Sequence, residues 1–436
     1  MKESYKREYY YMLKRLKNKI FDLFKGGFFH IFIGNTMIKL IAFVSSIVIV
    51  RLVSKSDYAY LAYADNLYNY VVSLAGMGMT AAVLKYCATA QTQQEDKAYF
   101  CFALKYGTLT QIICSAIVVG YTFYASIPFP EAKPIIVALF LYPILNNVLN
   151  VFLNYLRAHG YNQLYAKAGL AQTIIVFVMS VVLVITFGII GIAFARYLAI
   201  IVAILCIIKV LLKELESVPK IKLTKCQKKA FLAMSFSLMI SNLFSLIMPI
   251  NEMTLINQLI RDEIVTSNYK IAMMIPSQLP FITNSIIIYY FTIIAKMQEG
   301  RQIWKLSKKV GFVNFGIISG ISFIGAVLTP FIIKVVYGNQ YMDAGALSVF
   351  FWIVHAMNAI FRLIPMNFLP AIGVVKFNAF MAAFSCLLHV CIAYVSIKIY
   401  GIWGAGVAAC VVYFISGILY WLYYRKYCMK INNEIC

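Results

Sequence analysis

Two cations stand inside apolar stretches that are long enough to cross a membrane. Lys39 lies within the run 31–53, and Arg196 lies within the run 188–212. A charge held near the centre of a bilayer is costly, so one that is retained usually faces a cavity or a partner. Cations at such depth suit an anionic ligand, and a phosphate or pyrophosphate is the simplest choice.

Two stripes of amide and guanidinium side chains accompany these cations. The stripes consist of Asn146, Asn150, Asn154 and Arg157 in one run and of Asn358 and Arg362 in a later one. Their spacing places each set on one helical face, which predicts a polar, water-accessible cavity lined by substrate-binding groups. Two plainer interpretations stay open. Asn side chains also join membrane helices, and arginines near helix ends can reach lipid phosphate.

Two acids also lie within apolar runs, Asp65 in 58–84 and Glu252 in 230–256. We interpret them either as partners of the intramembrane cations or as carriers of a coupling proton or sodium ion. No other cofactor is expected. The four histidines are too scattered for a metal site, and the cysteines form no C-x-x-C pair, so no metal is predicted.

The sequence contains no G-x-x-x-x-G-K-[ST] phosphate loop and no nucleophile constellation. We therefore expect neither ATP hydrolysis nor any other enzymatic activity. A membrane glycan polymerase or ligase would need a large external loop carrying catalytic Arg and His residues. The loops on the side predicted to face outward are short, so that class is disfavoured.

Composition fixes the broad class of the chain. Hydrophobic residues make up 62% of the 436 residues, charged residues only 13%, and the mean hydropathy is +0.80. Such a chain is an all-α integral membrane protein, because its apolar runs are continuous rather than alternating. The net charge of +23 could suggest nucleic acid as a partner. The cations instead cluster between apolar runs, as the positive-inside rule produces, so no nucleic acid is expected.

We predict twelve transmembrane helices, each about 20 residues long. Lys and Arg concentrate in alternate loops, which places both termini in the cytoplasm. The predicted parts are a basic amphipathic segment at 1–30, an N-lobe of six helices at 31–212, a cytoplasmic linker at 213–229, a C-lobe of six helices at 230–424 and a cytoplasmic tail at 425–436. The basic segment is expected to lie on the membrane surface, and the alternative is a plain solvated basic tail.

The second half of the chain repeats features of the first half. Three glycines, Gly160, Gly188 and Gly191, return 213 positions later as Gly373, Gly401 and Gly404. A half with six spans is even-numbered, so both halves enter the membrane in the same direction. The two lobes should then be related by an axis along the membrane normal, which is how many transporters are built.

Several short motifs resemble those of a known family. The hinge from Arg51 to Tyr58 (RLVSKSDY) is followed by a span ending in LAGMG at Gly78; later come Asn268-Tyr269-Lys-Ile-Ala272 and Tyr337-Gly338-x-x-Tyr341. Together they resemble the polysaccharide and O-antigen flippases of the multidrug/oligosaccharidyl-lipid/polysaccharide (MOP) exporter superfamily. Ser54 and Ala59 stand where that family usually has glycines, and Glu252 stands where it often has Asp.

The resemblance implies a MATE-like, V-shaped pair of six-helix lobes in the bacterial inner membrane. It implies flipping of undecaprenyl-pyrophosphate-linked oligosaccharide repeat units by alternating access, for O-antigen, capsule or exopolysaccharide biosynthesis. Its partners would be the lipid-linked substrate, membrane lipids and other polysaccharide assembly proteins. The alternative within the superfamily is a cation-coupled multidrug or small-molecule antiporter, which would need an acidic pocket for its cationic drugs.

Overall fold

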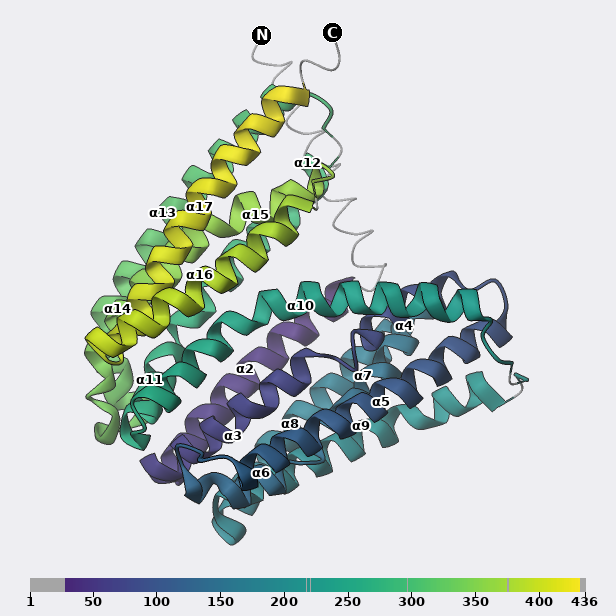
Figure 1. The fold of residues 1–436 in the computed structure, drawn as a ribbon, viewed down its shortest axis with the longest axis horizontal. Helices are drawn as coiled ribbons and strands as arrows, with labels where there is room; N and C mark the ends of the chain where they lie inside the picture. Colours follow the sequence, from purple (N-terminus) through teal and green to yellow (C-terminus); the bar gives the residue numbers. More distant parts are fainter. Residues whose placement is uncertain (1–27, 217, 220, 296, 375, 432–436) are drawn as a thin grey trace, which may run out of the picture. The chain divides into compact units, whose positions relative to one another are not determined.

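The computed structural model describes residues 28–216, 218–219, 221–295, 297–374 and 376–431, and these form helices joined by turns and irregular segments, with no strand (Figure 1). Residues 1–27 of the predicted amphipathic segment and 432–436 of the predicted tail lie outside the described residues. An all-helical chain is expected where hydrocarbon offers no water to backbone N–H and C=O groups.

By their contacts the residues form two compact units. The first unit, built from residues up to 53 and from 74–121 and 134–240, holds α2 (Phe28–Leu52), α4 (Met79–Thr89), most of α5 (Gln93–Tyr124), α6 (Lys133–Ala138), α7 (Tyr142–Ala158), α8 (Asn162–Phe187), α9 (Gly191–Glu216) and the first part of α10 (Lys225–Leu259). Its core is rich in aromatic rings from several helices; for example, Phe231 stacks on Tyr99.

The second unit comprises residues 54–73, 122–133 and 241 onward. It holds α3 (Lys55–Ser73), the rest of α10, α11 (Glu263–Met274), α12 (Leu279–Ile294), α13 (Gly300–Ile332), α14 (Ala344–Met357), α15 (Leu363–Ala371), α16 (Lys376–Tyr400) and α17 (Trp403–Ile431). By these contacts α3 belongs with the helices after Ser241, whereas the predicted lobes put it in the first. The lobe boundaries 31–212 and 230–424 stay a prediction.

Several predicted spans are broken rather than continuous. The run 58–84 divides into α3 and α4 at Ala75, Gly76, Met77 and Gly78, all of which have positive φ. The run 268–295 bends by 40° between α11 and α12 near Pro276, which lacks the N–H that a continuous helix needs there. Such breaks are tolerated at membrane depth only where other groups satisfy the freed carbonyls.

Seven helical stretches among the described residues are long and apolar enough to cross a membrane, or up to eight if the bent pair of α11 and α12 counts as one. One of the seven, Asn162–Glu216, contains both α8 and α9. This measure supports a multi-pass membrane protein. The count of twelve and the orientation of the termini stay predictions.

The repeat seen in the sequence is also a repeat of backbone structure. After α7 the amides of His159 and Tyr161 donate to the carbonyl of Leu156; after α15 the amides of Ile372 and Val374 donate in the same way to Leu369, 213 positions later. The glycines between these donors are left-handed in both copies, with φ +80° at Gly160 and +85° at Gly373. Both helices therefore end in the same glycine-dependent cap.

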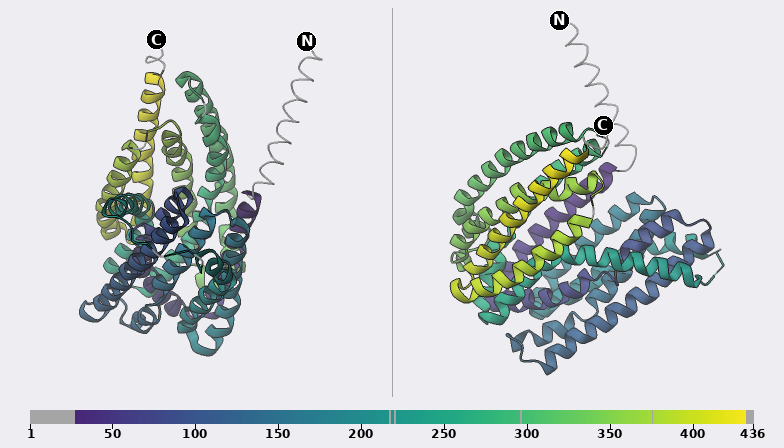
Figure 2. Two further views of the ribbon diagram at one scale, coloured as in Figure 1. Left: turned by 90° about the vertical axis from the view of Figure 1, so that its right-hand side faces the viewer. Right: turned by 45° about the horizontal axis from the view of Figure 1, so that its top comes forward.

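A second shared turn joins α8 to α9 and α16 to α17, and the helices of each pair pack side by side (Figures 1 and 2). Gly188 and Gly401 lie in these turns with φ of +61° and +58°. A Cβ added at Gly191 would lie 2.1 Å from the carbonyl oxygen of Leu183, and one at Gly404 would lie 2.1 Å from that of Ser396. Each hairpin thus depends on a glycine where the next helix begins.

A polar cluster holds helix ends together in the first unit, between two of the candidate membrane spans. Asp96, near the start of α5, accepts a hydrogen bond from the hydroxyl of Tyr155 at 2.8 Å and lies 3.1 Å from Nε2 of His159. The bond to the Asp96 carboxylate raises the pKa of His159, although partial burial opposes the change. The neighbouring Lys97 donates to the carbonyl of Val218 at 2.6 Å, after α9.

Replacing either hairpin glycine should destabilise the protein. Gly191→Ala and Gly404→Ala each force a methyl group against a backbone carbonyl that cannot move freely, at a cost of about 1–3 kcal/mol. Thermal unfolding of the purified protein in detergent should show a lower midpoint for both. The matched controls are Gly120→Ala in α5 and Gly320→Ala in α13, where no atom lies within 4 Å of the added carbon. Equal midpoints for all four variants would contradict this account of the hairpins.

The Asp96–His159 pair should make stability depend on pH. Because folding raises the pKa of His159, the pair stabilises fully below the unfolded histidine pKa of about 6.5, and its contribution disappears as pH rises through the higher folded value. His159→Gln should therefore lower the unfolding midpoint at about pH 6 and have little effect at about pH 9. Tyr155→Phe also removes a hydrogen bond to the Asp96 carboxylate, but the tyrosine hydroxyl does not titrate in this range. It should therefore lower the unfolding midpoint equally at both pH values.

Candidate functional site

Three of the arginines that the sequence predicted as substrate-binding residues lie over tyrosine rings. In the first unit the guanidinium carbon of Arg196 is 5.1 Å from the ring centre of Tyr142, and that of Arg157 is 4.9 Å from Tyr165. In the second unit Arg362 lies 5.7 Å from the ring of Tyr413. Such a contact attracts the cation to the negative face of the aromatic ring, and the N–H groups of a guanidinium are the atoms that bind anions.

The amide stripe lies on α7 as predicted, and its three asparagines are half-buried. The side chain of Asn150 donates to the carbonyl oxygen of Asn146 at 2.8 Å, so part of its bonding capacity is used within the helix. The fully buried neighbour Asn147 reaches the hydroxyl of Thr108 instead. Lys39 is exposed on α2.

The remaining predicted residues belong to the second unit. Asn358 and Arg362 begin and end a π-helical turn between α14 and α15, a deviation often found at functional sites. Asp65 is half-buried on α3, and Glu252 is buried on α10. The cations Lys39, Arg157 and Arg196 are thus in one unit and Arg362 in the other. A common substrate cavity stays a prediction.

A buried carboxylate is the centre of the polar contacts in the second unit. One oxygen of Glu252, Oε2, accepts a hydrogen bond from the hydroxyl of Tyr269 at 2.8 Å. The other, Oε1, lies 2.9 Å from Nε2 of His389. Glu252 is 5% exposed, Tyr269 1% and His389 0%. Three helices, α10, α11 and α16, therefore meet at one carboxylate.

Other ionisable side chains surround this carboxylate from the remaining helices. The electrostatic field of Glu252 reaches His355 on α14 and both Cys410 and Tyr413 on α17. Within the described residues, neither Nδ1 of His389 nor Nε2 of His355 has a hydrogen-bonding partner. Among those residues no group of three or more His, Cys, Asp or Glu could hold a metal ion.

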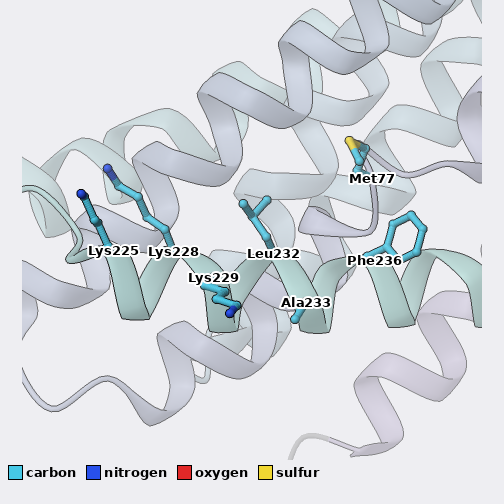
Figure 3. A pocket seen from close by; sticks show the side chains of 7 residues that line it. All are labelled: Met77, Lys225, Lys228, Lys229, Leu232, Ala233 and Phe236. Carbon is cyan, nitrogen blue, oxygen red and sulfur yellow. The ribbon is translucent and has the colours of Figure 1, made fainter.

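A groove in the first unit brings cations and apolar side chains onto one surface (Figure 3). It has a volume of about 650 Å³ and is lined by Lys225, Lys228, Lys229, Leu232, Ala233 and Phe236 of α10, together with Met77. The α10 residues follow the spacing of one helical face, with lysines in the first turns and apolar residues after them. Met77 comes from the left-handed turn between α3 and α4.

Reasoning from the sequence misses two features of these sites. It treats His389 as an isolated histidine, because nothing in the sequence indicates that it meets Glu252, 137 residues away. It assigns the lysines of α10 only to the inner charge cluster and the linker. Their spacing against Leu232 and Phe236 is the signal that could have found the groove.

Comparisons with known proteins identify the family. The profile of a family described as "Polysaccharide biosynthesis protein" matches residues 24–298, more than half of the chain. No curated protein matches significantly.

Solved structures identify the fold. One similar structure is an inward-facing multidrug resistance MATE family transporter of the MOP superfamily, 15% identical, with a TM-score of 0.70, covering 91% of this chain and 96% of that one. Another is the lipid II flippase MurJ in an inward closed conformation, 16% identical, TM-score 0.70, covering 92% and 89%. A MOP superfamily transporter from Pyrococcus furiosus, whose binding pocket is described as having reverse polarity, is 13% identical with a TM-score of 0.63, covering 92% and 94%. The chain therefore belongs to the polysaccharide biosynthesis protein family, and it has a MATE/MurJ-like fold.

Proposed function

We propose that this protein flips undecaprenyl-pyrophosphate-linked oligosaccharide repeat units across the bacterial inner membrane by alternating access, for surface polysaccharide biosynthesis. The membership in the polysaccharide biosynthesis family supports the pathway, and the likeness to a lipid II flippase supports the fold for such a task. The proposal includes twelve helices in two lobes with both termini in the cytoplasm. Its partners would be membrane lipids, the lipid-linked substrate and other polysaccharide assembly proteins.

The observation that carries the proposal is the groove on α10. Three lysines stand at one end and Leu232, Phe236 and Met77 at the other (Figure 3). A lipid with a pyrophosphate head has the same order, a compact anion followed by an apolar chain. Lysines attract such a headgroup near the membrane surface, and the apolar residues cover part of the chain. We infer that the groove receives the carrier lipid of the substrate.

Deeper groups would act on the headgroup during translocation. In the proposed route Lys39, Arg157, Arg196 and Arg362 contact the pyrophosphate, while the asparagines of α7 and Asn358 bond to sugar hydroxyls. The cation–π contacts keep the three guanidinium groups over tyrosine rings, and a guanidinium binds a phosphate oxygen through its N–H groups. Asp65 and Glu252 are the proposed carriers of a coupling proton or sodium ion.

The second candidate is a cation-coupled multidrug or small-molecule antiporter. The likeness to a multidrug resistance MATE family transporter favours it at the level of fold. The lysines of the groove disfavour it, because they repel cationic drugs. Purified protein in liposomes separates the two candidates: we expect movement of a pyrophosphate-linked oligosaccharide and no movement of a cationic dye. The reverse result would establish the antiporter.

Removing the groove lysines should weaken binding of the carrier lipid. Each lysine near a membrane surface contributes about 1 kcal/mol to binding an anionic headgroup, so Lys225→Gln, Lys228→Gln and Lys229→Gln together should weaken binding of undecaprenyl pyrophosphate roughly a hundredfold. Titration calorimetry in detergent at low salt measures the change, and undecaprenol, which lacks the anion, should bind equally to both proteins.

The chain offers a matched control for this triple variant. Lys305, Lys308 and Lys309 of α13 have the same spacing and also precede apolar residues, but they do not line the groove. Their replacement by Gln should leave the affinity for undecaprenyl pyrophosphate within about twofold of the wild type. If both triple variants lose affinity equally, the groove is no substrate site.

Loss of the deep cations should abolish transport while the protein still inserts. Lys39→Ala and Arg196→Ala should each remove surface glycan from cells, because each removes one of the cations proposed to contact the pyrophosphate within the membrane. Glycan display and membrane abundance are measured in the same cells. Lys105→Ala is the control, since Lys105 is exposed as Lys39 is and lies over a tyrosine ring as Arg196 does, at 5.6 Å, but it is outside the proposed route. Full display in both variants would refute the cationic route.

A further inference from the structure

The π-helical turn from Asn358 to Arg362, between α14 and α15, leaves a buried carbonyl without its helical partner. The amide of Leu363 donates to the carbonyl of Asn358, five residues earlier. In an α-helix the same amide would bond to Ala359, four residues earlier. Ala359 is 0% exposed, so its carbonyl cannot turn to water instead. Such a group costs free energy unless another donor reaches it.

Asn314 of α13 supplies that donor. Its Nδ2 donates to the carbonyl of Ala359 at 3.0 Å, and its Oδ1 accepts a hydrogen bond from the hydroxyl of Thr283 on α12 at 2.9 Å. Asn314 and Thr283 are both 0% exposed. Because the threonine engages the oxygen of the amide, the nitrogen is the atom left for the π-turn. The amide of Asn314 therefore joins α12 to the turn.

A close contact with α17 holds the same turn. A Cβ added at Gly417 would lie 2.7 Å from the Cβ of Phe361 and 2.9 Å from its carbonyl oxygen. A glycine is needed for the two segments to approach this closely. One turn before Gly417, Tyr413 provides the ring over which the guanidinium of Arg362 lies. The same helix thus contacts both the π-turn and the arginine that ends it.

Much of the bonding capacity of this arginine is unused. Within the described residues, Nε of Arg362 is buried without a hydrogen-bonding partner, and Nη1 only meets the sulfur of Met248 at 4.0 Å, a weak acceptor. Among the same residues its guanidinium forms no ion pair. A partly buried cation without an acid is costly, and an anionic ligand would compensate its charge. The end of the π-turn is therefore suited to a phosphate.

The π-turn also determines where this guanidinium lies. A π-turn contains one residue more than the α-helical turn that it replaces, and one residue of an α-helix corresponds to a rotation of about 100°. Without the donor from Asn314, the α-helical pattern becomes favourable, because the amide of Leu363 would then satisfy the carbonyl of Ala359. Arg362 would rotate relative to α14 and leave the ring of Tyr413.

We propose that Asn314 is a positioning residue for Arg362. By bonding to Ala359 it keeps the π-turn formed, and the turn holds the guanidinium where it contacts a phosphate of the substrate. The positioning concerns only the protein. The contact with phosphate rests on the proposed function, in which Arg362 is one of the cations that meet the pyrophosphate. Asn314 is fully buried, so it acts only through the turn.

The positioning is tested first without any substrate. In ¹⁵N-arginine-labelled protein in detergent, Arg362→Lys identifies the Nε signal of this arginine by removing it. The ring of Tyr413 shifts that signal, so Tyr413→Leu should move it toward the position of an exposed arginine. Asn314→Leu has a similar volume but no donor, and it should move the signal by a comparable amount. A signal that stays in place in Asn314→Leu overturns the positioning role.

Two further variants keep this test specific. Ser322→Ala is the matched control, because Ser322 also lies on α13 and donates to a carbonyl of α14, that of Trp352 at 3.0 Å, outside the π-turn. It should leave the arginine signal unchanged. Thr283→Val removes the hydroxyl that orients Asn314 and should move the signal in the same direction as Asn314→Leu. Thr283→Val decides the question if Asn314→Leu does not fold, and an unchanged signal there overturns the proposal.

The contact with phosphate is tested by transport of a pyrophosphate-linked oligosaccharide in liposomes. Arg362→Gln should lower the maximal rate roughly tenfold, because it removes a charge-assisted hydrogen bond. Asn314→Leu should lower the maximal rate by up to the same factor. The substrate concentration at half-maximal rate should not change in either, since the lysines of the α10 groove are intact. Adding Asn314→Leu to Arg362→Gln should cause no further loss, because Asn314 acts only through Arg362.

The outcomes separate this inference from the proposed function. A further loss of rate in the double variant means that Asn314 supports the fold in general, and it overturns the positioning role. A normal rate in Arg362→Gln overturns the contact with phosphate, while the arginine signal still decides whether Asn314 positions the guanidinium. Failure of the wild type to move any oligosaccharide overturns the proposed function and the phosphate contact, but not the positioning.

Discussion

Hydrocarbon offers no water to polar groups, so every buried donor, acceptor or charge of this chain must find a partner in the protein. That constraint explains why the regular structure of the described residues is helical. It also explains where the intramembrane cations lie: Arg196 and Arg362 rest on the faces of Tyr142 and Tyr413, which partly replace the lost hydration. The same constraint forces Glu252 into contact with two donors.

At a break in a helix, backbone N–H and C=O groups lose their partners within the helix. The two halves of the chain satisfy these groups with the same backbone conformations. The caps after α7 and α15 use equivalent amides, carbonyls and a left-handed glycine, 213 residues apart. The two hairpins then begin their second helix with a glycine against a backbone carbonyl. Close packing of backbones replaces the hydrophobic effect, which does not drive helices together in lipid. The repeat is thus a repeat of backbone conformation at helix ends and hairpins rather than of side-chain chemistry.

Features that depend on local patterns could be predicted from the sequence. Apolar runs predicted the helices, and the return of Gly160 as Gly373 indicated the repeat in which both glycines prove to be left-handed. The resemblance in short motifs predicted the family. The sequence did not predict that α3 and α4 are separate helices, since Ala75 and Met77 are not residues expected at positive φ. Nor could it predict the meeting of Glu252 and His389, because contacts between distant helices depend on three-dimensional packing.

The groove lysines and Glu252 differ in how their charge is stabilised, because they differ in exposure. The lysines of the α10 groove are near water, so they stay charged at little cost and their full attraction is available to an arriving anion. Glu252 is buried, so its charge has to be matched locally before anything binds. Its neighbours, the phenol of Tyr269 and the imidazole of His389, are the groups that each of its oxygens contacts in place of water.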